Sequence, residues 1–355
     1  MNDYINIDSA QLDRLDAVKE GYKRLYEQPS QCRPMIIINV VGGRSVSWEE
    51  KLADPMVMLR AKLDEIKLHL AVEDDIVPAA RVDFGTGIIA SAFGCEITYP
   101  ENNLPAVKSH PVENTADIYR LEKPRLNAGL IAKAFDWIGL WKENLPDWIR
   151  IQPFDIQGPF NNAHLIRGND ILLDFYDDAA AVQKLLDIIT DYTIDVVREM
   201  NKLIDVEDGW FCDWGGAYWK GAARISNCST DMISPQFYID NVFDRDVRLL
   251  SSLGSGRMHY CGSHRAVIDE FFKNPAITGL DIDASIHDLW EVAESAPEKL
   301  VLVFQDYNGA FPDVQRLLDG DWPEKRNIVL ITNVETVEEG KDLRAKLLES
   351  MPYQN

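Results

Sequence analysis

Two hydrophobic patterns alternate along the chain. Short apolar runs, such as 300–304 and 328–331, are hydrophobic at every position. Strands that are apolar on both faces are typical of parallel sheets covered on both sides. Longer segments, such as 179–203, instead place apolar residues at every third or fourth position. That spacing predicts amphipathic helices.

Strand and helix patterns follow one another to the end of the chain. The extended segments are predicted at 35–41, 75–83, 149–155, 209–212, 256–259, 279–282, 300–304 and 327–331. The helices are predicted at 47–70, 127–141, 160–167, 179–203, 234–251, 263–272, 285–295, 311–318 and 337–350. This alternation predicts an α/β fold with a parallel sheet. GxGxxG and GxxxxGK[ST] motifs are absent, so a nucleotide-binding doubly wound sheet has no support and a (β/α)8 TIM-like barrel fits better.

The 355 residues first suggest two domains of about 150 residues each. The regular βα rhythm instead favours one barrel domain over 35–355, preceded by a helical extension at 1–34. The segment 95–125 is polar, irregular and rich in proline, and we predict an insertion there.

Charge narrows the range of partners. The chain has 36 Lys and Arg against 58 Asp and Glu, a formal net charge of −22. Such acidity disfavours nucleic acids and anionic membrane surfaces, which carry the same sign. Five cysteines, an odd number without a CxxC pair, are typical of a reduced intracellular protein. With no signal peptide and no apolar run near 20 residues, the expectation is a cytoplasmic protein.

The clearest candidate chemistry is a His-x-Cys pair at the end of a predicted strand. A period of two places His259 and Cys261 on one face, with Cα atoms roughly 6.6 Å apart. An imidazole nitrogen and a thiolate at this spacing can hold Zn²⁺, and a catalytic zinc site needs three protein ligands and an open position. A core histidine beside an inert buried cysteine gives the same pattern.

An aromatic cluster follows the predicted strand at 209–212. We predict that Trp214, Tyr218 and Trp219 form flat walls around a ligand, although a packed aromatic core has the same composition. Within this cluster, Asp213 is a candidate acid, base or anchor for a substrate hydroxyl.

Two further strand ends carry polar groups. Asp155, Gln157 and Asn161 are predicted at a pocket floor, where helix capping and turn formation are the alternative role. Arg81 interrupts an apolar stretch and is predicted to hold a substrate carboxylate, the alternative being an internal Arg–Asp pair.

Four motifs together resemble the uroporphyrinogen decarboxylase superfamily, over the chain from about residue 35 onward. They are Asp155-Ile-Gln-Gly-Pro159, Tyr176-Asp-Asp178 before a long helix, Ser234-Pro235-Gln-Phe-Tyr238 and His259-Tyr-Cys261-Gly262. The resemblance implies a TIM-like barrel. True uroporphyrinogen decarboxylases carry an early Arg-Gln-Ala-Gly-Arg segment, which the corresponding stretch 34–44 lacks.

The motifs are closer to the corrinoid-dependent methyltransferase branch of that superfamily. This branch binds zinc through His-x-Cys and a later cysteine, and His259 and Cys261 match the first two positions. No cysteine follows Cys261. The candidates for the third ligand are Asp306, the preferred one, and also Asp213 and Cys212.

The resemblance implies a methyltransferase that moves a methyl group between a small methylated compound (methoxy, methylamine or thiol) and a corrinoid carried by a partner protein, with zinc assisting. Asp155, Asp213 and His259 are the predicted catalytic residues. A lyase acting on a porphyrinogen or a smaller carboxylic acid is the first alternative. A non-catalytic binder of a small molecule is the second.

Overall fold

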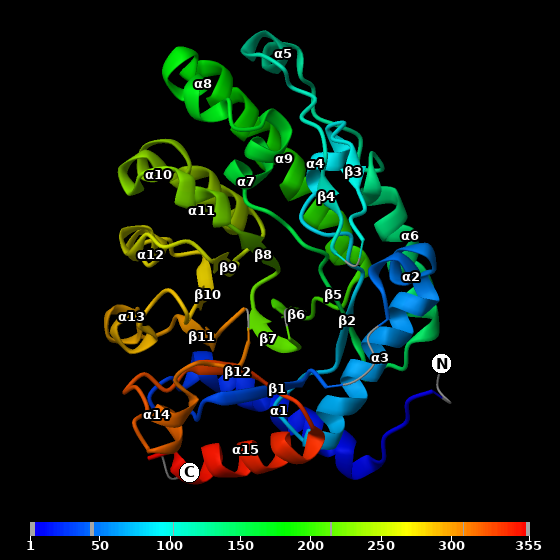
Figure 1. The fold of residues 1–355 in the computed structure, drawn as a ribbon, viewed down its shortest axis with the longest axis vertical. Helices are drawn as coiled ribbons and strands as arrows, with labels where there is room; N and C mark the ends of the chain where they lie inside the picture. The colour runs from blue at the N-terminus through cyan, green and yellow to red at the C-terminus, as the bar shows by residue number, and fades with distance from the viewer. Residues whose placement is uncertain (1–3, 43–45, 102, 214, 308, 353–355) are drawn as a thin grey trace.

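Eight parallel strands form a ring in the computed structural model, which describes residues 4–42, 46–101, 103–213, 215–307 and 309–352 (Figure 1). Six strands are hydrogen-bonded in the order β1-β12-β11-β10-β9-β8. They are β1 Met35–Val40, β8 Ala223–Ser226, β9 Gly256–Tyr260, β10 Ile277–Asp283, β11 Val301–Gln305 and β12 Ile328–Val334. The other two, β2 Ala79–Arg81 and β5 Arg150–Gln152, pair with each other. The predicted α/β fold with a parallel sheet is confirmed.

The two groups of strands meet at both ends without a full ladder. Beyond β5, Gln157 forms a single parallel bridge to Ser226 of β8. Between β1 and β2, carboxylates replace a strand: the amides of Ile36 and Ile38 donate to Asp75 and Asp74, each at 2.8 Å. The amide of Asp75 also donates to the carbonyl oxygen of Ile36 at 2.8 Å, so side-chain and backbone hydrogen bonds together complete the ring at this point.

Helices surround the ring of strands (Figure 1). They are α1 Ser9–Glu27, α2 Trp48–Ala53, α3 Pro55–Val72, α4 Ile88–Ala92, α5 Thr115–Arg120, α6 Leu130–Asn144, α7 Pro159–Arg167, α8 Ile171–Asp177, α9 Ala179–Leu203, the 3₁₀ turn η1 Cys228–Met232, α10 Pro235–Asn241, α11 Phe243–Ser252, α12 Arg265–Phe271, α13 Leu289–Ser295, α14 Val314–Leu318 and α15 Val337–Ser350. Among the described helices, none combines the length and the apolar character needed to cross a membrane.

The helix predicted at 47–70 is in fact two helices, α2 and α3. Asp54 ends the first and caps the second by accepting from the amide of Met56 at 2.7 Å. Pro55, the first residue of α3, lacks the amide hydrogen that a continuous helix would use.

The strand predicted at 209–212 is not a barrel strand. Residues Trp210–Asp213 (β6) pair antiparallel with Ala217–Lys220 (β7), and this hairpin lies within the ring (Figure 1). Its turn contains Gly216, with φ of +77°, where a Cβ atom would lie 2.3 Å from Ile76. The fourth barrel strand is β8, which was not predicted because only four residues, Ala223–Ser226, carry the pattern.

The hairpin packs against apolar residues that point into the barrel. Phe211, Cys212 and Trp219 are each 1% exposed or less and share a buried cluster with inward-facing residues of β1, β11 and β12. Helix α1 contributes to the same cluster and contacts β7, so it covers the amino ends of the strands. This packing fills the amino-terminal half of the barrel.

The predicted irregular insertion contains a small antiparallel pair, β3 Ile97–Thr98 with β4 Ala106–Val107, followed by helix α5. Strands β3 and β4 lie beside α4 at the outside of the barrel, and α5 packs against α9 (Figure 1).

Candidate active site

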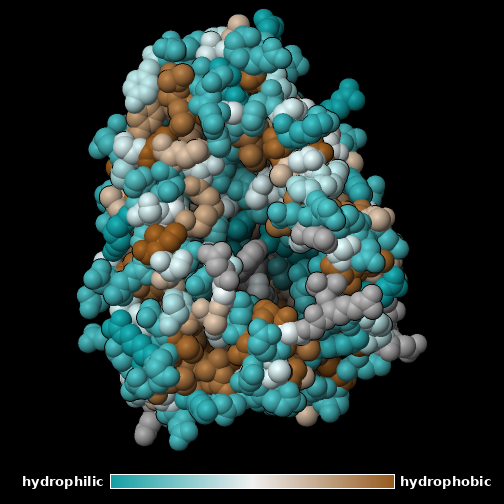
Figure 2. Space-filling model, viewed as in Figure 1, coloured by the Kyte–Doolittle hydropathy of each residue, from teal (hydrophilic) through white to brown (hydrophobic). Residues whose placement is uncertain are grey.

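A cavity of about 950 Å³ lies at the carboxyl ends of the strands. The space-filling view is hollowed near its centre (Figure 2). Several predicted site residues border this cavity; they are Arg81, Asp155, Gln157, Asn161, His259 and Cys261. Segments far apart in the sequence therefore meet at one place, as expected for the carboxyl end of a barrel.

Two cysteines and a histidine converge on the cavity wall. The ligand atoms of Cys228, His259 and Cys261 all lie within 4.8 Å of one another. Strand register explains this convergence, because Ser226 of β8 pairs with His259 of β9 and each strand is followed by a cysteine. Some catalytic zinc sites have two thiolates and an imidazole as protein ligands and leave a fourth position open for water or substrate.

The two sulfur atoms are close even without a metal. Cys261 Sγ lies 2.7 Å from Cys228 Sγ. Two thiolates on a tetrahedral zinc ion lie roughly 3.7 Å apart. Binding of zinc would therefore increase the distance between these two sulfur atoms by about 1 Å.

The third member of this group is Cys228, which was not among the ligands predicted from the sequence. Among the described residues, none of the predicted third ligands, Asp306, Asp213 or Cys212, joins it. Asp306 follows β11, two strands away from β9, whereas Cys228 follows the adjacent strand β8. Recognising Ala223–Ser226 as a strand would have placed Cys228 at a strand end.

An ion pair and a hydroxyl group hold the imidazole of His259. Its Nδ1 lies 2.7 Å from Oδ2 of Asp281 and 2.9 Å from the hydroxyl of Tyr307, which also donates to Asp281. Burial lowers the pKa of His259, but the charge and hydrogen bond of Asp281 outweigh it and raise the pKa to about 9. Although burial raises the pKa of Asp281, the charges of Arg257 and His259 hold that pKa well below its usual range.

The hydrogen bond between Cys261 and Cys228 shifts the pKa values of the two thiols in opposite directions. The hydrogen bond from Cys261 lowers the pKa of the Cys228 thiol, despite its burial. The same hydrogen bond raises the pKa of Cys261, which donates it. The lowered pKa favours the thiolate of Cys228, the form that binds metals.

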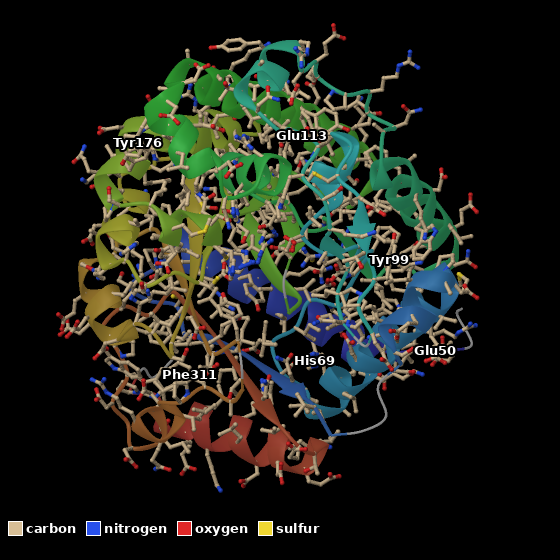
Figure 3. All side chains as sticks on the ribbon, turned by 45° about the horizontal axis from the view of Figure 1, so that its top comes forward. Glu50, His69, Tyr99, Glu113, Tyr176 and Phe311 are labelled. Atoms are coloured by element: carbon tan, nitrogen blue, oxygen red, sulfur yellow. The ribbon has the colours of Figure 1, made fainter. Side chains whose placement is uncertain are left out.

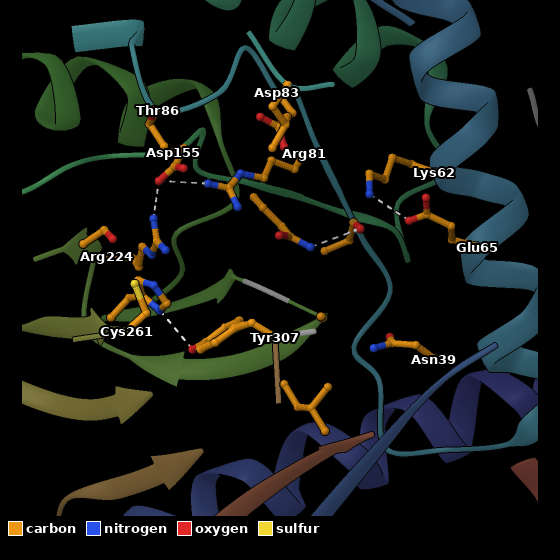
Figure 4. A pocket seen from close by; sticks show the side chains of 18 of the residues that line it. Asn39, Lys62, Glu65, Arg81, Asp83, Thr86, Asp155, Arg224, Cys261 and Tyr307 are labelled. Carbon is orange, nitrogen blue, oxygen red and sulfur yellow. Dashed lines mark hydrogen bonds and ion pairs between the residues drawn. The ribbon is translucent and has the colours of Figure 1, made fainter. Parts of the chain in front are cut away.

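A series of charged side chains of alternating sign crosses the barrel interior. It runs from the cavity to Asp281, the partner of His259. In order they are Arg81, Asp155, Arg224, Asp213, Arg257 and Asp281. Figure 4 shows Asp155 between Arg81, at 3.5 Å, and Arg224. Burial raises the pKa of Asp155, but the charges of Arg224 and Arg81 outweigh burial and lower the pKa below its usual value. This carboxylate is therefore ionised.

Two residues predicted from the sequence, Asp213 and Arg81, belong to this series of ion pairs. Asp213 is fully buried behind the cavity wall and lies 3.0 Å from Arg257. Arg81 forms an internal ion pair with Asp155, the alternative role that the sequence left open, while still bordering the cavity.

Of the predicted aromatic walls, Tyr218 and Trp219 lie in the buried core and do not border the cavity. Tyr218 stacks on Trp210 with ring centroids 5.3 Å apart, and Trp219 packs under the guanidinium of Arg257 at 5.0 Å. Trp214 lies outside the described residues. Its neighbours Gly215 and Gly216 border the cavity.

Other cavity residues come from α2 and α3. Lys62 and Glu65 form an ion pair at 2.7 Å (Figure 4). His69 lies near the middle of the molecule, whereas Tyr176 lies at its periphery (Figure 3). The buried His69 is paired with Asp74 at 2.6 Å, one of the two carboxylates that join β1 to the segment before β2.

Comparison with known proteins agrees with this fold. Residues 44–209 match the uroporphyrinogen decarboxylase (URO-D) family, and the resemblance predicted from the motifs is confirmed. A solved methyltransferase from Methanosarcina mazei aligns over 94% of this chain and 98% of its own, with 18% sequence identity and a TM-score of 0.70. At this identity the likeness establishes the fold.

A second solved structure is more distant. The oxidized form of the homocysteine methyltransferase MmuM from Escherichia coli aligns over 92% of this chain and 99% of its own. Its sequence identity is 12% and its TM-score of 0.36 is too low to support an argument. Among curated protein sequences, none matches the chain at a significant level.

Proposed function

We propose that this protein is a methyltransferase of the corrinoid-dependent type, in which Cys228, His259 and Cys261 hold a catalytic zinc ion. The observation that carries the proposal is the meeting of these three side chains on the wall of a deep cavity. The URO-D family match and the shared fold of a solved methyltransferase support it.

The donor set fits zinc. Nδ1 of His259 is engaged by Asp281, so Nε2 is left to bind the metal, and the lowered pKa of Cys228 favours its thiolate. When bound, zinc supplies a Lewis acid for the oxygen or sulfur that carries the methyl group. Three protein ligands leave one position for that atom.

The part of the cavity wall next to this group would orient the substrate. Gln157 donates to Asp155 at 2.8 Å and accepts from Asn161 at 2.9 Å, so the three side chains have defined donor and acceptor directions. We propose that Asp155, Gln157, Asn161 and Arg81 contact the methylated substrate. The corrinoid, carried by a partner protein, would approach through the cavity mouth.

The competing function is a decarboxylase-like lyase. Arg81 and Arg224 border the cavity on either side of Asp155, an arrangement that suits a carboxylate substrate and an acid that holds ring N–H groups. Both arginines are, however, already paired with Asp155, and this reaction assigns no role to the Cys228–His259–Cys261 group.

Metal content and methyl transfer together test the proposal. We expect about one zinc per purified chain. We also expect methylation of free cob(I)alamin, standing in for the protein-borne corrinoid, from methanol, a methylamine, a methoxybenzoate or methanethiol. The absorbance change from cob(I)alamin to methylcobalamin measures it. Absence of zinc, or conversion of uroporphyrinogen without methyl transfer, would contradict the proposal.

A further inference from the structure

Asp281 of β10 lies directly beside His259 of β9. The two residues are partners in the strand register, and both side chains point into the barrel. The carboxylate Oδ2 is 2.7 Å from Nδ1 of His259. Oδ1 of the same carboxylate accepts from Arg257.

Arg257 and Asp281 are both completely buried, so their positions are tightly determined. Asp213 binds Arg257 from the other side, through Nε at 3.1 Å and Nη2 at 3.0 Å. Each charge is thus compensated by a neighbour of opposite sign. Asp281 has no freedom to turn away from His259 without leaving a buried arginine unpaired.

Tyr307 adds a second constraint from the cavity side. It follows β11, borders the cavity, and donates its hydroxyl hydrogen to the carboxylate oxygen that faces His259. Its ring also packs edge-on against the imidazole, with centroids 4.9 Å apart. Asp281 itself does not border the cavity.

We propose that Asp281 and Tyr307 are positioning residues for the metal site: together they hold the proton of His259 on Nδ1 and direct Nε2 toward Cys228 and Cys261. A carboxylate that accepts from a ligating histidine fixes the ring orientation and makes the other nitrogen a better ligand. This inference rests on the zinc site of the proposed function. It adds two residues that act through His259 and are not themselves ligands of the metal.

Metal binding by two variants tests the inference without any activity assay. Asp281→Asn keeps the shape but removes the charge, and we expect zinc affinity to fall about 10- to 100-fold, measured by competition with a chromophoric chelator. Tyr307→Phe removes only the hydroxyl, and we expect a fall of roughly 3- to 10-fold. In both, the visible absorption of bound Co²⁺ should change, because the imidazole no longer holds one orientation.

Each variant has a matched control. Asp174→Asn breaks a buried ion pair, with Arg167 at 2.7 Å, far from the site. Tyr192→Phe removes a buried hydroxyl that donates to the backbone carbonyl oxygen of Arg125 at 3.1 Å. Both controls should bind zinc and Co²⁺ as the unaltered protein does, even if their stability falls.

The outcomes separate the two claims. Unaltered protein that binds zinc, together with a folded Asp281→Asn variant of equal affinity and Co²⁺ spectrum, overturns the inference and leaves the proposed function standing. Should Asp281→Asn fail to fold, equal affinity and spectrum for Tyr307→Phe overturn it. Unaltered protein that binds neither ion overturns both claims.

Discussion

The two halves of the barrel interior are built from different strands and differ in chemistry. At the amino ends, β1, β11 and β12 direct valine, isoleucine and methionine inward onto the hairpin β6–β7 and helix α1. From the other side of the ring, β2, β8, β9 and β10 direct Arg81, Arg224, Arg257, His259 and Asp281 inward. The first half is a dry core, and the second borders the cavity.

The difference separates stability from chemistry. Burying apolar side chains such as Trp219 stabilises the fold. Burying ions costs free energy that their mutual attraction only partly offsets, so they persist where each has a partner of opposite sign. The polar half satisfies this condition from Arg81 to Asp281. We infer that the amino-terminal half supplies the stability that the site requires.

The hairpin connects the two halves. From one strand Asp213 extends to Arg257, and from the other the Trp219 ring packs beneath the same guanidinium at 5.0 Å. The hairpin is therefore both core filler and support for the residue that holds Asp281.

The largest expected effect comes from Cys228→Ser in the polar half. Loss of one of three zinc ligands should reduce metal content from about one ion per chain to a small fraction, and methyl transfer at least about 10³-fold. Metal analysis and the cobalamin assay measure both. Cys212→Ser, in the apolar half, should cost stability and keep the zinc; zinc loss in that variant instead would reverse the assignment of the two halves.

Trp219→Ala in the apolar half should show the opposite behaviour. Removing a tryptophan that is 1% exposed leaves a cavity and should lower the free energy of unfolding by about 3–5 kcal/mol. Denaturant unfolding at low temperature measures this. The folded variant should still bind zinc, and zinc loss without a loss of stability would show that the halves are not separable in this way.

The smallest expected effect is a difference in thiol reactivity between the two halves, compared in zinc-free protein through Cys228 and Cys212. Burial raises the pKa of Cys212 to about 12, whereas the hydrogen bond from Cys261 lowers the pKa of Cys228. Because only a thiolate attacks iodoacetamide, Cys228 should be alkylated at pH 6.5 and Cys212 should remain unmodified until the chain unfolds. Peptide mass spectrometry identifies the site, and equal labelling of both cysteines would refute the contrast.

Local patterns in the sequence were sufficient for most of the fold. The alternation of strand and helix patterns located seven of the eight barrel strands, and the signal was clearest in runs that are apolar on both faces, such as 300–304 and 328–331. The pattern failed where a strand was only four residues long, at Ala223–Ser226, and where the segment 209–212 had the composition of a barrel strand but formed a hairpin.

The sequence by itself paired His259 with Cys261, since a period of two places these residues on one face at the end of a predicted strand. Only the tertiary structure decided that Cys228 joins them and that Asp281 holds the imidazole, because these residues belong to neighbouring strands. The tertiary structure also places Tyr218 and Trp219 in the core, whereas the sequence had predicted them at the cavity wall. A ligand set drawn from several strands depends on strand order and register, and these are properties of the whole barrel.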